Sequence, residues 1–170
     1  MASENNMQPS LEFQGVLLYN QWVLQDDKLR YEAVQLWKRN SILPHSAAAD
    51  DRARELVVVA LNDSGEAVGV NTIYKGELPK AAPDEPTRRC YYYRMFIETG
   101  SRKPHLMRIM TNMVHEILRV NRRVGDPETL AIITDNLGLT RPGMLALFER
   151  HGGVILMRLP SGKLLIAKKL

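Results

Sequence analysis

The chain has 170 residues, of which 45% are hydrophobic and 25% charged, and its formal net charge is +4 at pH 7. This composition is typical of one folded domain and excludes a disordered or low-complexity chain. No apolar run approaches the roughly 20 residues that span a bilayer, so no membrane partner is expected. A single cysteine, Cys90, excludes an internal disulfide and a zinc finger, and it indicates a reducing, cytoplasmic setting.

We expect a flexible polar tail over residues 1–14 and a single domain over residues 15–170. Residues 15–24 predict a first strand, and residues 26–40 carry apolar side chains at helical spacing. Residues 41–51 contain a proline and a run of alanines, which leaves a loop and a short second helix as alternatives. Two β-branched runs, 55–61 and 67–74, flank the turn sequence Asn-Asp-Ser-Gly and predict a hairpin.

The prolines in residues 75–89 predict a long loop. The strand-like run CYYYRMFIE then leads through the basic turn TGSRKPH into an amphipathic helix, and the apolar run TLAIIT follows that helix. A strand, a crossover helix and a second strand imply two parallel strands. A proline-capped helix near residue 142 and a hairpin around Pro160–Lys163 complete the chain. Edge strands in this hairpin favour a homodimer or a larger assembly.

The basic turn after the fourth predicted strand is the best candidate for a binding site. Arg102 and Lys103 lie where a new helix offers N–H groups without intrahelical partners. Such a helix start, with its dipole and neighbouring cations, favours a phosphate. The other basic residues are spread along the chain, and no alternation of aromatic and basic residues indicates nucleic-acid binding.

The predicted order of elements resembles that of the GNAT superfamily of acyl-coenzyme-A-dependent N-acyltransferases from about residue 15 to the C-terminus. The sequence LALFERHGG, residues 145–153, is similar to the ending of the family's late helix. The strand leading into Arg102 and the long helix is the second similarity. The resemblance implies a mixed α/β sheet of about seven strands, splayed at its centre and flanked by helices.

The resemblance also implies a cofactor and its contacts. Acetyl-coenzyme A or another acyl-coenzyme A would deliver its acyl group to an amine of a small molecule or protein. Phe96, Ile97 and Glu98 would face the pantetheine and thioester, and Ser101–Arg108 would hold the pyrophosphate. The cofactor-binding residues on this basis are Phe96, Ile97, Glu98, Ser101, Arg102, Lys103, His105, Arg108 and Phe148.

Three residues differ from the family pattern. His105 and Met107 stand where the family turn has small residues, and Phe148 stands where a late-helix tyrosine protonates the departing thiolate. Phenylalanine has no proton to give. These differences motivate the alternative of a non-catalytic binding or structural module on the same fold, in a larger assembly such as a viral particle. A transferase that modifies an RNA-bound substrate is a third alternative.

Two carboxylates are candidates for the base that deprotonates the amine, directly or through water. Glu98 ends the fourth predicted strand and Asp135 ends the fifth, so both should open on one rim of the sheet. Each also has a structural interpretation, Glu98 as a turn residue and Asp135 in turn bonding with Asn136. The four histidines lack metal-ligand spacing, and no metal site is expected.

Overall fold

A computed structural model of the protein describes residues 8–43, 46–80, 82, 84–134, 141–150 and 152–170. Its contacts divide the chain into two compact units. Unit 1 comprises residues 1–72 and 95–117, and unit 2 comprises residues 73–94 and 118–170. The boundary passes through two strands and one helix, which therefore contribute to both units, and a single domain over 15–170 stays a prediction.

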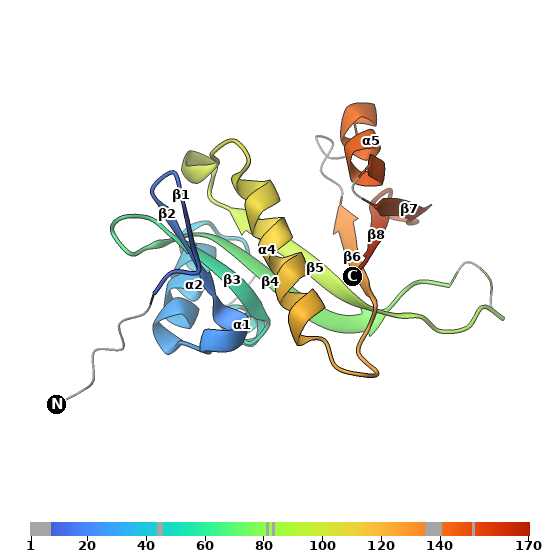
Figure 1. The fold of residues 1–170 in the computed structure, drawn as a ribbon, viewed down its shortest axis with the longest axis horizontal. Helices are drawn as coiled ribbons and strands as arrows, with labels where there is room; N and C mark the ends of the chain where they lie inside the picture. Colours follow the sequence, from blue (N-terminus) through green and yellow to red (C-terminus); the bar gives the residue numbers. More distant parts are fainter. Residues whose placement is uncertain (1–7, 44–45, 81, 83, 135–140, 151) are drawn as a thin grey trace. The chain divides into compact units, whose positions relative to one another are not determined.

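Within the described ranges, the strands form one eight-stranded mixed sheet in the order β1-β2-β3-β4-β5-β6-β8-β7 (Figure 1). The neighbours β5 and β6 are parallel, as the strand–helix–strand pattern predicted. The mixed α/β class is thereby confirmed. The strands are β1 Leu11–Phe13, β2 Val16–Asn20, β3 Leu56–Leu61, β4 Ala67–Glu77, β5 Arg89–Ile97, β6 Thr129–Thr134, β7 Gly153–Arg158 and β8 Leu164–Lys169.

The first strands differ from the sequence prediction in two ways. β1, which lies within the predicted flexible tail, pairs with β2 in a hairpin and is the strand beyond the expected seven. The strand expected to reach Leu24 ends at Asn20, whose side chain accepts the N–H of Val23 at 3.3 Å. This cap starts the short helix α1, Gln21–Leu24.

Helices α2, Asp27–Arg39, and α3, Ser46–Ala53, complete the N-terminal part of unit 1. Asp26 caps α2 by accepting the N–H of Leu29 at 2.9 Å. The apolar stripe of α2, including Leu29, Leu36 and Trp37, is buried in one cluster with Val59 and Val70. Of the two interpretations of residues 41–51, the helix is correct from Ser46 onwards.

Helix α4, Leu106–Asn121, packs on the other face of the same strands. Gly69 is paired with Ala60 directly beside the Val59–Val70 pair, so its face of the sheet is opposite to that of α2. A Cβ on Gly69 would lie 3.3 Å from Met110 Sδ and 3.4 Å from Ile97 Cγ1. The glycine thus lets the first half of α4 approach the sheet closely.

Unit 2 contains the sheet's C-terminal strands and helix α5, Pro142–Arg150. Its core includes a stack of the Tyr74 and Tyr92 rings, with centroids 5.0 Å apart. A Cβ on Gly76 would lie 2.8 Å from the Tyr92 ring, so this stack requires glycine there. Cys90 is fully buried, and this burial raises the pKa of its thiol. None of the helices in the described ranges has the length and apolar character needed to cross a bilayer.

Candidate anion-binding site

The turn between β5 and α4 lies wholly in unit 1 and begins at Glu98. The Glu98 N–H donates to the carbonyl of Val68 at 2.9 Å, which fixes the end of β5 against β4. A single 3-10 turn, η1 over Thr99–Ser101, follows, and the Ser101 N–H returns to the Glu98 carbonyl at 2.9 Å. The chain then reaches α4 through residues 102–105, which include three of the predicted phosphate-binding residues, Arg102, Lys103 and His105.

His105 has a left-handed backbone with φ of 68°, a conformation that usually favours glycine. This is the position where the resemblance places a small residue, so the turn keeps a glycine-like backbone although it carries a side chain. The side chains of His105 and Met107 are both exposed. Both side chains are therefore accessible to solvent at the start of α4.

The start of α4 has N–H groups available to an anion. Leu106 donates its N–H to the Lys103 carbonyl at 3.2 Å, and Ile109 donates to the His105 carbonyl at 3.0 Å. In the described part of the chain, no backbone carbonyl accepts the N–H groups of Met107 and Arg108, which lie between them. Unpaired donors at the positive end of a 16-residue helix favour a negative charge.

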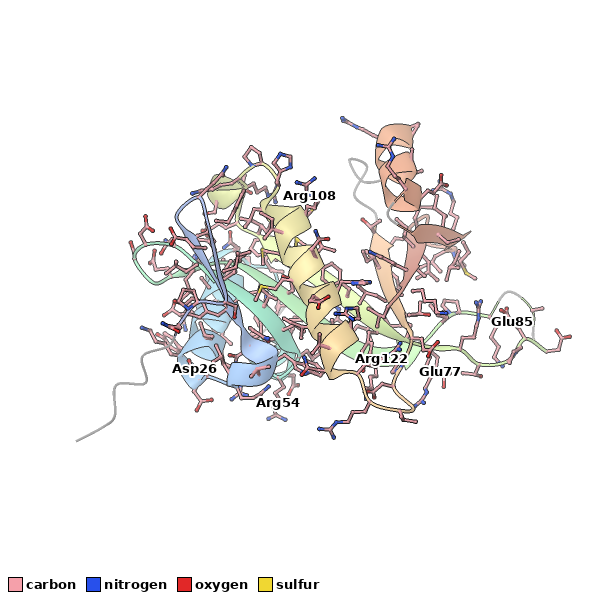
Figure 2. All side chains as sticks on the ribbon, in the orientation of Figure 1. Asp26, Arg54, Glu77, Glu85, Arg108 and Arg122 are labelled. Atoms are coloured by element: carbon pink, nitrogen blue, oxygen red, sulfur yellow. The ribbon has the colours of Figure 1, made fainter. Side chains whose placement is uncertain are left out.

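Two exposed arginines, Arg102 and Arg108, lie near these N–H groups in the sequence, while Lys103 is already hydrogen-bonded within the protein. Arg102 is exposed, and its Nε donates to the Ile97 carbonyl at 3.2 Å. Arg108 is exposed at the first turn of α4 (Figure 2). Lys103 instead donates its Nζ to the carbonyl of Gln14 in the β1–β2 turn. The available positive charge therefore comes from the two arginines.

Glu98 is held by two residues from the end of α2. Its Oε1 accepts hydrogen bonds from Arg39 Nε and Asn40 Nδ2, both at 2.9 Å, and its Oε2 accepts one from Arg39 Nη2 at 3.2 Å. These bonds, foremost that from Arg39, hold the pKa of the Glu98 carboxyl below its usual value. The sequence analysis did not identify Arg39 or Asn40, because basic residues in a last helical turn already have a local explanation.

The two other residues predicted to contact pantetheine lie just before the turn. Phe96 is half-buried against the core cluster of α2, and Ile97 is buried near Gly69. In unit 2, β5 and β6 pair in parallel through Tyr91 with Leu130 and Tyr92 with Ala131.

Other predicted groups lie partly outside what the structure describes. Asp135 is outside the described residues, and so is the side chain of Phe148. Burial raises the pKa of Tyr91 and of Tyr92 to about 12, and the Tyr92 hydroxyl donates to the Glu77 carbonyl at 2.8 Å. Tyr91 and Tyr92 therefore pack within unit 2 with protonated hydroxyls. No group of three potential metal ligands occurs among the residues that are described.

Comparison with solved structures assigns the fold. The chain is similar over 91% of its length to a GNAT-family acetyltransferase from Streptococcus pneumoniae, with a TM-score of 0.56, 15% identity and 99% of that chain covered. It is similar over the same share to Arabidopsis thaliana NAA60 in complex with a bisubstrate analogue, with a TM-score of 0.58, 10% identity and 99% of that chain covered. A NatC complex bound to Gag peptide and CoA gives a TM-score of 0.58 at 10% identity, over 91% of this chain and 98% of that one.

No family model matches the chain, and no curated protein matches its sequence. At these low identities, the structural similarity establishes the fold and leaves the activity to be argued from the site. The protein is of the mixed α/β class with an open sheet flanked by helices. More particularly, it has the fold of the GNAT acetyltransferases, as the sequence resemblance indicated.

Proposed function

We propose that this chain is an acyl-coenzyme-A-dependent N-acyltransferase that transfers an acetyl or other acyl group to an amine of a small molecule or protein. The observation that carries the proposal is the turn before α4. It combines unpaired N–H groups, a glycine-like backbone at His105 and two exposed arginines, Arg102 and Arg108. Together these groups match a diphosphate, which accepts several hydrogen bonds and carries negative charge.

Binding of the diphosphate at this turn would determine where the other parts of the cofactor lie. The pyrophosphate would accept bonds from the N–H groups of Met107 and Arg108 and from both guanidinium groups. The pantetheine arm would run along the end of β5, where Phe96 and Ile97 precede Glu98. A backbone N–H on this segment would stabilise the tetrahedral oxyanion. Ser101 and His105 remain proposed anion contacts, and Phe148 a proposed cofactor contact.

The reaction forms a C–N bond between the amine and the thioester carbonyl carbon and breaks the C–S bond. One proton leaves the amine, and one is taken up by the departing thiolate. Holding the thioester beside the amine would supply much of the rate acceleration. Asp135 and Glu98 are the proposed acceptors of the amine proton, directly or through water. The bonds to Arg39 and Asn40 make Glu98 a weaker base, so they favour Asp135 for this role.

A specific observation also supports the alternative of a non-catalytic module. Lys103 and Glu98, two of the predicted site residues, are used in internal contacts with Gln14 and Arg39. A domain that binds no cofactor could keep both contacts for stability alone. The two functions differ in whether the remaining cations, Arg102 and Arg108, serve a ligand.

Thermal unfolding with acetyl-coenzyme A tests the proposal, because a ligand that binds only the native state raises its stability. We expect a rise in Tm at millimolar acetyl-coenzyme A and its loss in the double variant Arg102→Ala/Arg108→Ala. Arg54→Ala is the matched control, since Arg54 is an exposed arginine at the other end of unit 1 in Figure 2. No shift for the unmodified protein would favour the non-catalytic module.

A further inference from the structure

The end of α2 contacts the anion-binding turn through a set of side-chain bonds. Arg39 donates to both carboxylate oxygens of Glu98, Nε to Oε1 at 2.9 Å and Nη2 to Oε2 at 3.2 Å. Its Nη2 also donates to the carbonyl of Ala67, the first residue of β4. One guanidinium group therefore joins the ends of α2, β4 and β5.

Asn40 adds a second connection from the same helix end. Its Nδ2 donates to the Leu36 carbonyl at 2.9 Å, which caps α2, and to Glu98 Oε1, also at 2.9 Å. The side chain is thus fixed by its own helix while it holds the carboxylate. Oε1 accepts two bonds and Oε2 one, so the orientation of the Glu98 side chain is determined from two directions.

The main chain of Glu98 carries this restraint into the turn. Its N–H is bound to Val68, and its carbonyl accepts the N–H of Ser101 that closes the 3-10 turn. The carbonyl of Ile97, one residue earlier, accepts Arg102 Nε. A shift of Glu98 would therefore displace both ends of the segment that presents Arg102 and leads to α4.

We propose that Arg39 and Asn40 are positioning residues that act through Glu98 to hold the anion-binding turn in its ligand-binding geometry. This inference rests on the proposed function for its ligand, and it concerns residues that do not themselves touch the cofactor. A preorganised turn loses little conformational freedom on binding, and small displacements of such groups weaken binding and catalysis strongly. The ion pair itself is partly exposed, with side chains 35% and 28% accessible, so stabilising the whole fold is a minor part of its role.

The experiment compares Arg39→Met with Arg39→Lys, Asn40→Ala and a control, Arg30→Met. Arg30 lies on the same helix and pairs with Asp27, so the control removes an arginine and an ion pair away from the turn. The first readout is amide hydrogen exchange at Glu98, Ser101 and Arg102 in the absence of ligand. The second readout is the Kd for acetyl-coenzyme A, measured by calorimetric titration.

We expect Arg39→Met to speed exchange at these three amides and to raise the Kd by about tenfold or more. Arg39→Lys should recover part of both effects, and Asn40→Ala should cause a smaller change in the same direction. In the double variant Arg39→Met/Glu98→Gln, the Kd should rise no further than in the more affected single variant, because both changes break one connection.

Unchanged exchange at the turn in Arg39→Met would overturn the inference, whether or not the unmodified protein binds acetyl-coenzyme A. Faster exchange with an unchanged Kd would overturn it as well. If the unmodified protein binds no acetyl-coenzyme A, the proposed function fails, and the exchange readout alone decides whether Arg39 holds the turn. Asn40→Ala keeps the inference testable should Arg39→Met fail to fold.

Discussion

Arg39 Nε lies 2.9 Å from Glu98 Oε1, and this contact joins the last turn of α2 to the residue that follows β5. The two residues are 59 positions apart in the chain. The residue predicted as a general base is therefore also the point at which the end of α2 contacts the turn before α4. The contribution of this contact to the free energy of unfolding can be measured separately from any effect on cofactor binding and turnover.

The pH dependence of stability tests the ion pair. Because the hydrogen bond from Arg39 holds the folded-state pKa of Glu98 below its usual value of 4.5, the stability that Glu98 contributes is fully present above that value. The contribution is lost as the pH falls through the lower folded pKa. Arg39→Met should cost on the order of 1 kcal/mol or less in the free energy of unfolding at pH 7, and it should cost less well below the folded pKa, where only the bond from Arg39 to the Ala67 carbonyl is still lost. Urea unfolding at several pH values measures this, and an equal loss at all pH values would contradict it.

Glu98→Gln separates the two proposed roles of this residue. Glutamine can still accept a bond from Asn40 but loses the charge that pairs with Arg39. We expect a severalfold rise in the Kd for acetyl-coenzyme A, measured by titration, because the turn loses its restraint. A lower kcat with an unchanged Kd would instead identify Glu98 as the base and not as an anchor.

His105→Gly tests the left-handed backbone of the turn. Since φ is 68° at this position, glycine should relieve strain and raise the free energy of unfolding by up to about 1 kcal/mol. Met107→Gly is the matched control, because Met107 lies in the ordinary helical backbone of α4 and should lose about 1 kcal/mol instead. Urea unfolding of both variants provides the comparison. A loss of stability in His105→Gly would show that the left-handed conformation is not strained.

Gly76→Ala tests the packing of unit 2. The added Cβ would lie 2.8 Å from the ring of Tyr92 and would force apart the stack with Tyr74. Overpacking of this kind should lower the free energy of unfolding by roughly 1–3 kcal/mol. Gly143→Ala is the control, because nothing lies within 4 Å of its added Cβ and alanine favours a helix. Equal stability of the two variants would refute the close contact.

The sequence predicted those parts of the fold that depend on local patterns. The stripe of α2, the β-branched run of β3 and the parallel pair β5–β6 follow from periodicity and chain order. Two features were not predicted. The short helix α1 depends on one capping side chain, that of Asn20, and the strand β1 is only three residues long.

For the candidate site too, the sequence predicted only what depends on local patterns. A basic turn at a helix start predicts a candidate anion site from the sequence alone, and Arg102 and Arg108 are exposed there. The contacts of Lys103 with Gln14 and of Glu98 with Arg39 join residues 89 and 59 positions apart. No local sequence pattern predicts such contacts. Only the folded structure shows that Lys103 and Glu98 are engaged in internal contacts.

The most direct test of the central claim is titration of the isotopically labelled protein with acetyl-coenzyme A, followed by backbone amide NMR. The proposed site predicts shifts at Ser101, at residues 105–109 and at residues 96–98, saturating with a single Kd. Arg102→Ala/Arg108→Ala should remove them at the same ligand concentration. An unchanged spectrum at millimolar acetyl-coenzyme A, or shifts confined to residues outside these segments, would contradict the assignment of this turn as the cofactor site.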